Sequence, residues 1–404
     1  MTTRHWPRAL ALLFTMGLAT AACGSDDAAT TAETGSATTA KGGATTAGSS
    51  DDTTADSAGE DTAAADLSKV CPALVVVQTD WFPESEHGAL YHLLGDDYKI
   101  DADQKRVSGA MTVDGQDLGI DIEIRAGGPA IGSGTVGAEM YVDDSITLGY
   151  GTTDGQILRW EDTPMLSVMA PLELNPQIIY WDPQTYPDIK TLADLGKSDV
   201  TINVFGGGTF AEVFVAQGLW QEKQIDPSYD GSPARFVSEG NIAQQGFASA
   251  EPWIYKNQVT DFGRDLQFQL LNDAGFPVYS QTLAIRPDDL DTLRPCLKEL
   301  VPVFQQATVD YYDNPDDTNA KIVETVKAYD TFWTYPAELA DFSVAKQLEL
   351  GLAGNGPDDT VGNMDGARIQ EVLDALTTAK MEFPADIKAS DLFTNEFIDP
   401  DIGF

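Results

Sequence analysis

The sequence has little cysteine, histidine and positive charge. Its 404 residues include three cysteines, three histidines and 24 lysines and arginines, against 64 aspartates and glutamates. The formal net charge of −40 argues against sequence-independent binding of nucleic acid, which depends on clustered basic residues. Three cysteines are too few for a disulfide scaffold, and the absence of any CxxC spacing argues against zinc ribbons and thioredoxin-like redox sites.

Residues 1–23 are typical of a signal peptide. A basic start precedes the apolar stretch 9–19, which is too short to span a bilayer as a resident helix. Residues 18–24 resemble the lipobox of bacterial lipoproteins, which implies that Cys23 is lipidated. Thr20 stands where a lipobox usually has leucine, so ordinary secretory cleavage stays open as the alternative.

Residues 24–66 consist almost entirely of small and acidic residues and contain no aromatic side chain. Such a segment cannot bury enough apolar surface to offset the entropy lost on ordering, so we predict a disordered acidic tether. Together, the signal peptide and this tether predict an exported bacterial protein that a lipid anchor holds on the outer face of the cytoplasmic membrane.

From residue 67 to residue 404, short apolar runs alternate with helical patterns, which is typical of an α/β protein. The continuous β-branched run at 73–79 suits a strand that is buried on both faces. Further strands are predicted at 118–124, 146–150, 166–170, 177–181, 200–205 and 281–285, and helices at 209–218, 289–312, 317–331, 336–350 and 365–378. No internal repeat is visible.

Two cysteines, Cys71 and Cys296, lie in this body. In an oxidising compartment we expect them to form one disulfide, and two free buried thiols are the alternative. The pairing would join the first strand to a helix in the last third of the chain. The first and last thirds would then belong to one lobe, and the middle of the chain would form another.

Four segments resemble one protein family in the same order along the chain. They are QTDWFPESEHGALY at 78–91, GNIAQQGFASAEPW at 240–253, GARIQ at 366–370 and NEFID at 395–399. Together they resemble solute-binding proteins of ABC importers, in the branch that handles thiamine pyrimidine precursors, riboflavin, nitrate, sulfonates and taurine.

This resemblance implies a type II periplasmic-binding-protein fold, in which two α/β lobes joined by a two-crossing hinge close on a small molecule in a cleft. Lobe 1 would comprise 67–168 and 276–404, and lobe 2 would comprise 169–275. The implied partners are a small-molecule ligand, an ABC permease with its ATPase subunits, and the membrane through the lipid anchor. We expect a monomer that binds no nucleic acid.

Ligands of open α/β sheets bind beyond the carboxyl ends of the strands, so residues that directly follow strands are candidate site residues. Asp80, Trp81 and Phe82 follow the first strand, and His87 lies in the same segment. An indole can stack on a flat ring, and a carboxylate can accept hydrogen bonds from its amino groups. The alternative is that Trp81 packs between helices and Asp80 caps the helix that starts near Ser85.

Glu251, Trp253 and Tyr255 follow the apolar segment 247–250, and Pro252 suits the first position of a helix. Glu251 would face the cleft as an acceptor, with Trp253 or Tyr255 as a second stacking face. A helix cap with aromatic residues in the core is the alternative.

Two further turns are candidates. The hydroxyls and carboxylate of Thr152, Thr153 and Asp154 follow a strand and would line the cleft or cap the next helix. The backbone amides of Gly207, Gly208 and Thr209 lie between a strand and a helix and could meet an anion. No Gly-Lys-Ser/Thr completes a P-loop there, so a flexible turn is the alternative.

The sequence predicts no metal site, no cofactor and no catalytic residue. His87 and His92 are five residues apart and do not share a helical face, and no G-x-S-x-G elbow is present. Pyrimidine synthases of thiamine assembly resemble this fold but rely on a cysteine-rich motif, whereas Cys71 and Cys296 are distant. We therefore expect a binding protein, with a ligand sensor as an alternative.

The candidate side chains are acidic and aromatic, whereas a small anion needs preorganised donors to replace its hydration. A flat heterocycle with amino groups fits better. An aminopyrimidine precursor of thiamine is the favoured ligand, with riboflavin, nitrate, sulfonates and taurine as alternatives.

Overall fold

The computed structural model describes residues 66–132 and 134–404. The predicted signal peptide, the lipidation at Cys23 and all of the predicted tether except Asp66 lie outside the described residues. No described helix is both long and apolar enough to cross a bilayer.

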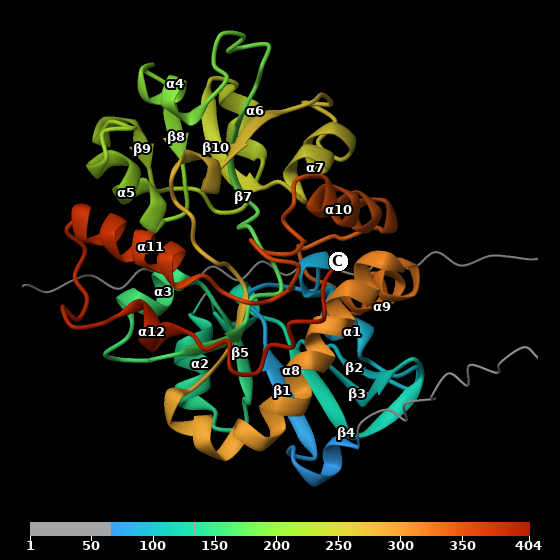
Figure 1. The fold of residues 1–404 in the computed structure, drawn as a ribbon. Coiled ribbons are helices and arrows are strands. Elements are labelled where there is room, and N and C mark those ends of the chain that lie inside the picture. The colour runs from blue at the N-terminus through green and yellow to red at the C-terminus, as the bar shows by residue number, and fades with distance from the viewer. Residues whose placement is uncertain (1–65, 133) are drawn as a thin grey trace, which may run out of the picture. The chain divides into compact units, whose positions relative to one another are not determined.

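The described strands form two mixed sheets (Figure 1). The first sheet has the order β2 (Lys99–Asp101), β3 (Arg106–Val113), β4 (Gln116–Arg125), β1 (Leu74–Gln78), β5 (Leu148–Gly151), β12 (Thr282–Ile285) and β6 (Leu166–Met169). The second has the order β11 (Gln267–Leu270), β7 (Gln177–Trp181), β10 (Ile242–Phe247), β8 (Thr201–Asn203) and β9 (Ile225–Asp226). The chain passes to the second sheet between β6 and β7 and returns between β11 and β12.

The α-helices are α1 (Gly88–His92), α2 (Val136–Val142), α3 (Thr153–Leu158), α4 (Leu192–Gly196), α5 (Thr209–Ala216), α6 (Ala234–Glu239), α7 (Glu251–Asn257), α8 (Leu290–Asp313), α9 (Asp316–Tyr329), α10 (Ala337–Glu349), α11 (Gly366–Thr378) and α12 (Ala389–Leu392). Short 3-10 helices are η1 (Leu67–Lys69), η2 (Ser85–His87), η3 (Gly128–Ile131), η4 (Glu222–Gln224), η5 (Asn272–Ala274) and η6 (Pro287–Asp289).

Strand β1 is buried on both faces, as its continuous apolar run predicts. It pairs in parallel with β4 and with β5. Val75 and Val77 pack in the core that contains residues of α1, α8 and α9, whereas Val76 packs with Met140 of α2 in a separate cluster. Because parallel strands end at the same edge, this arrangement brings the loops after β1 and β5 to one side of the sheet.

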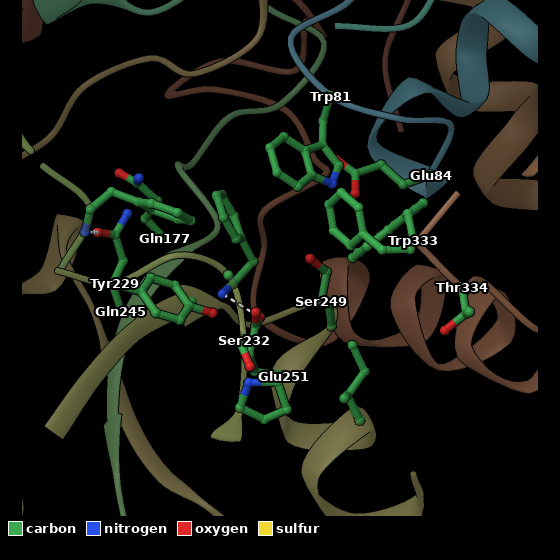
Figure 2. Close-up of a pocket in the computed structure, with 18 of the residues that line it drawn as sticks. Trp81, Glu84, Gln177, Tyr229, Ser232, Gln245, Ser249, Glu251, Trp333 and Thr334 are labelled. Atoms are coloured by element: carbon green, nitrogen blue, oxygen red, sulfur yellow. Dashed lines mark hydrogen bonds between the residues drawn. The ribbon is translucent and has the colours of Figure 1, made fainter. Parts of the chain in front are cut away.

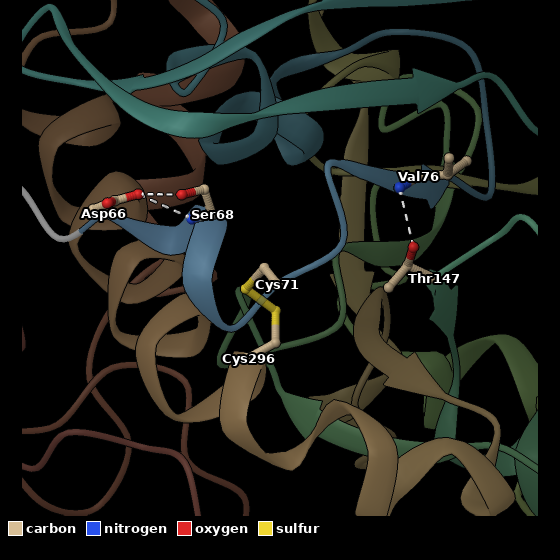
Figure 3. Close-up of a disulfide and its surroundings, with 6 residues drawn as sticks. All are labelled: Asp66, Ser68, Cys71, Val76, Thr147 and Cys296. Carbon is tan, nitrogen blue, oxygen red and sulfur yellow. Dashed lines mark hydrogen bonds between the residues drawn. A yellow bond between two sulfur atoms is a disulfide. The ribbon is translucent and has the colours of Figure 1, made fainter.

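The predicted disulfide between Cys71 and Cys296 is confirmed (Figure 3). It joins the segment that precedes β1 to α8 across a sequence separation of 225 residues. Cys296 is buried in the core of the first sheet. The first and last thirds of the body are therefore covalently joined.

The lobe boundaries predicted from the sequence stay a prediction, and the structure adds one difference. Helix α11, which the prediction assigns to lobe 1, contributes Val372 and Leu376 to the core that contains Ile179 of β7 and Ile202 of β8. Helix α10 contacts α7. The C-terminal helices thus pack on elements of both sheets.

Candidate functional site

The loop after β1 presents Trp81 to a cavity. Thr79 shapes this loop, because its hydroxyl donates to the backbone oxygen of Trp81 at 2.8 Å. Gly128, at φ +56°, leaves room for the indole: a Cβ at that position would lie 2.4 Å from Cε3 of Trp81. The ring of Trp333, in the loop between α9 and α10, lies 6.1 Å from that of Trp81 at an interplanar angle of 88°.

Two adjoining cavities lie near this loop. The larger of the two has a volume of about 730 Å³ and is lined by residues from elements of both sheets. Figure 2 shows Trp81, Glu84 and Trp333 on one side and Tyr229, Gln245 and Glu251 on the other. Its lining includes five acidic residues, Asp80, Glu84, Glu86, Asp230 and Glu251, and six aromatic residues, Trp81, Phe205, Tyr229, Phe247, Phe332 and Trp333. None of the described residues that line it is a lysine or an arginine.

Three of these carboxyl groups have raised pKa values. Burial raises the pKa of Glu84 well above its usual value, and repulsion from Glu86, Asp80 and Glu251 raises it further. Burial also raises the pKa of Glu86, although hydrogen bonds from Ser249 and Ser85 to its carboxylate act to lower that pKa. Burial raises the pKa of Glu251 to about 7, although its Oε2 accepts a hydrogen bond from the backbone amide of Phe247 at 2.6 Å.

The Glu251 carboxyl predicts a pH dependence of stability. A carboxyl whose pKa is raised in the folded protein holds an extra proton there, so its contribution to stability falls as the pH rises from about 4.5 through about 7. We expect the Tm of Glu251→Gln to fall less than that of the wild type between about pH 5 and about pH 8, because the variant lacks the titrating carboxyl. The amide oxygen of the glutamine can still accept the hydrogen bond from Phe247. Thermal unfolding of both proteins across this range measures the effect, and parallel Tm profiles would contradict it.

A hydrogen-bonded series links His87, Asp80 and Gln281. Nε2 of His87 lies 2.9 Å from Oδ1 of Asp80, and Nε2 of Gln281 donates to the same oxygen at 3.3 Å. Gln281 is only 4% exposed, adopts φ +55°, and its Oε1 has no hydrogen-bond partner among the described residues. A left-handed backbone at a residue other than glycine is uncommon, and such strain concentrates at functional sites.

A second cavity of about 410 Å³ adjoins the first and shares Asp80, Gln177, Phe205, Gln245, Phe247 and Gln281 with it. Thr152, Asp154 and the turn Gly207–Thr209 line it together with Arg159. The hydroxyl of Thr152 also caps α3 by accepting from the amide of Gly155 at 3.2 Å.

The structure thus brings together Asp80, Trp81 and Glu251 around the larger cavity, and Thr152, Asp154, Gly207, Gly208 and Thr209 around the smaller one. Trp81 and Glu251 line the same hollow, although they lie 170 positions apart in the sequence. Asp80 accepts from His87 and does not cap the following 3-10 helix, whose N-cap residue is Glu84.

The remaining predicted residues line neither cavity, and the expectation of a direct role for them is corrected. Phe82 packs with Ala126 and Tyr329. His87 is fully buried behind Asp80. The hydroxyl of Thr153 accepts from the amide of Tyr279, so it holds the connection that precedes β12.

The two aromatic residues of α7 point away from the cavity. Tyr255 is buried, and its hydroxyl accepts from that of Tyr180 at 2.8 Å. Trp253 packs against the core of the first sheet. Helical geometry explains Trp253, which is two residues after Glu251 and so lies on the opposite face of α7. Tyr255, four residues after Glu251, shares its face but is buried against Tyr180.

The sequence analysis missed several residues of the cavity. Glu84 and Glu86 lie within the segment that carried the family resemblance, so their position after a strand was an available signal. Tyr229 lies in a loop after β9, and Phe332 and Trp333 lie in the loop between α9 and α10. No local pattern marks these loops as neighbours of β1.

The described residues contain no group of three or more His, Cys, Asp or Glu side chains that could hold a metal ion.

No family model and no curated protein matches the chain. Solved structures match it at low sequence identity. A protein from Bordetella bronchiseptica RB50 has 16% identity and a TM-score of 0.51, with 81% of this chain and 96% of that chain covered. The ligand-binding component of an ABC-type import system from Staphylococcus aureus has 10% identity and a TM-score of 0.51, with 81% and 98% covered.

The periplasmic nitrate-binding protein NrtA from Synechocystis PCC 6803 has 13% identity and a TM-score of 0.51, with 80% of this chain and 87% of that chain covered. At these identities the likeness concerns the fold. The predicted α/β periplasmic-binding-protein fold is confirmed.

Proposed function

We propose that the protein is the extracytoplasmic solute-binding component of an ABC importer. The observation that carries the proposal is the cavity of about 730 Å³ that loops from both sheets line with aromatic and acceptor side chains. Pockets with an aromatic lining and a few convergent polar groups are typical of small-molecule sites. The fold it shares with binding components of importers supports the same role.

In this proposal, lobe 1 (67–168 and 276–404) and lobe 2 (169–275) close on the ligand without chemical change. The ligand stabilises the closed form through its higher affinity for that form. The closed protein then docks as a monomer on a permease whose ATPase subunits supply the energy. The lipid on Cys23 keeps it at the outer face of the cytoplasmic membrane.

The ligand that we propose is a small planar heterocycle with amino groups, and an aminopyrimidine precursor of thiamine is the favoured example. Trp81 offers a ring face, and the carboxyl groups of Asp80 and Glu251 offer hydrogen-bond acceptors. Riboflavin shares the planar shape.

Nitrate, sulfonates and taurine are the second candidate, because the smaller cavity contains groups that bind anions. Arg159, the hydroxyl of Thr209 and the turn at Gly207–Gly208 line it. The described residues that line the larger cavity include no arginine or lysine, and this favours a heterocycle over an anion as the ligand of that cavity.

A ligand screen tests the proposal. Thiamine precursors, flavins, sulfonates, taurine and nitrate would be compared by thermal shift, because a ligand that binds only the folded protein raises its Tm. We expect a shift with an aminopyrimidine, verified by calorimetry. Tight binding of nitrate, taurine or a sulfonate without any for pyrimidines would refute the proposed ligand.

Two other classes of function have their own tests. Absorbance near a cofactor band in the purified protein would reopen a pyrimidine-synthase activity. A signalling receptor encoded beside the gene, in place of a permease and an ATPase, would favour a ligand sensor.

A further inference from the structure

Glu84 lines the larger cavity without a partner for its charge. Its carboxylate makes no hydrogen bond and no ion pair with another described residue. The nearest charged groups that act on it are Glu86, Asp80 and Glu251, which are all acidic. A carboxylate in these surroundings is costly to ionise unless a positive charge comes from outside the protein.

Two indoles lie beside Glu84. The Nε1 of Trp333 donates to the backbone oxygen of Pro83, the residue before Glu84, at 3.2 Å. Trp81 meets Trp333 at nearly a right angle, with ring centroids 6.1 Å apart, and both rings line the cavity (Figure 2). Perpendicular indoles make a corner whose faces attract a cation through their quadrupoles.

An unpartnered acceptor lies on the same lining. Oε1 of Gln281 is buried and has no hydrogen-bond partner among the described residues, while Nε2 of Gln281 donates to Asp80. The amide thus donates to the protein, while its buried oxygen has no hydrogen-bond partner among the described residues. The Glu84 carboxylate, which lines the cavity without a partner, favours a ligand that donates hydrogen bonds.

We propose that the ligand of the larger cavity is an organic cation, with its positive charge in the corner formed by Trp81, Trp333 and Glu84. This inference rests on the proposed function and specifies the charge of the ligand. A cation would supply the counter-charge that the described lining lacks and would allow the buried carboxyl groups to ionise. A neutral heterocycle would stack on the same rings but leave Glu84 without a partner.

Two pairs of probes, whose members differ by one permanent charge, test the inference at about pH 8. The first pair is thiamine, a permanent cation, and its neutral thiophene isostere 3-deazathiamine. The second pair is 1-methylnicotinamide, also a permanent cation, and neutral nicotinamide. In at least one pair we expect the cation to bind about tenfold or more tightly than its neutral partner, as measured by calorimetry.

The variant Glu84→Gln assigns the preference to this side chain. It keeps the size of the side chain and removes its charge, so we expect the cation-to-neutral ratio of affinities to fall to about threefold or less. Glu371→Gln, the same change at an exposed position of α11, should leave the ratio unaltered. A Tm of Glu84→Gln that is no lower than that of the wild type shows that the fold is kept.

Equal or tighter binding of the neutral member in both pairs overturns the inference, as does the absence of binding by all four probes. An unaltered ratio in Glu84→Gln also overturns it. These outcomes are separate from a failure of the proposed function. If an uncharged aminopyrimidine binds and cations are not preferred, the proposed function stands and only the inference of a cationic ligand fails. If only nitrate or taurine binds, the ligand proposed under the function fails.

Discussion

Replacing Trp81 by alanine is expected to weaken ligand binding about ten- to a hundredfold, because stacking on an aromatic ring contributes roughly 1–3 kcal/mol. The indole lines the cavity and is only half-buried, so the fold does not depend on it as it depends on core residues. Calorimetry with the ligand found in the screen measures the change, and circular dichroism verifies the fold.

Trp253→Ala is the matched control for this variant. Trp253 was a candidate for the second stacking face, but it packs against the core of the first sheet and lines neither cavity. We expect its affinity for the ligand to equal that of the wild type. An affinity that is unchanged in Trp81→Ala, or equally reduced in both variants, would remove Trp81 from the site.

Removal of the Cys71–Cys296 disulfide is expected to lower the free energy of unfolding by about 4 kcal/mol. The bond closes a loop with a sequence separation of 225 residues and so restricts the unfolded chain strongly. The double variant Cys71→Ala/Cys296→Ala, compared with the wild type by denaturant unfolding, measures the loss.

A reducing agent provides the control for the disulfide. It should lower the Tm of the wild type toward that of the double variant and leave the double variant unchanged. A double variant as stable as the wild type would show that the bond contributes little beyond the packing of α8. Ligand affinity should persist in the folded variant, because neither cysteine lines either of the two cavities described above.

Segments with strong local patterns were predictable from the sequence. The run 73–79 predicted β1 because an unbroken series of β-branched residues suits a strand covered on both faces. The long amphipathic pattern at 289–312 predicted α8 to within one residue at each end. Strands β2, β3, β9, β10 and β11 were missed. In β3, Ser108, Gly109 and Thr112 stand among the apolar residues and interrupt the run.

The candidate site was only partly predictable. The rule that ligands bind beyond strand ends identified Asp80 and Trp81, and the lobe topology predicted that Glu251 faces them. The rule could not tell which faces of α7 are covered, so Trp253 and Tyr255 were assigned to the cleft. It also could not reveal that Gln281 adopts a left-handed backbone beside Asp80.

The sequence by itself determined the strongly patterned elements such as β1 and α8, the strongly acidic charge and the two cysteines that could pair, because these depend on composition and on periodicity between near neighbours. Only the tertiary structure decided that Glu84 and Trp333 lie on one wall of the cavity and Tyr229 on another. These residues come from loops far apart in the chain, and their meeting depends on how helices pack across two sheets. Local periodicity contains no information about that packing.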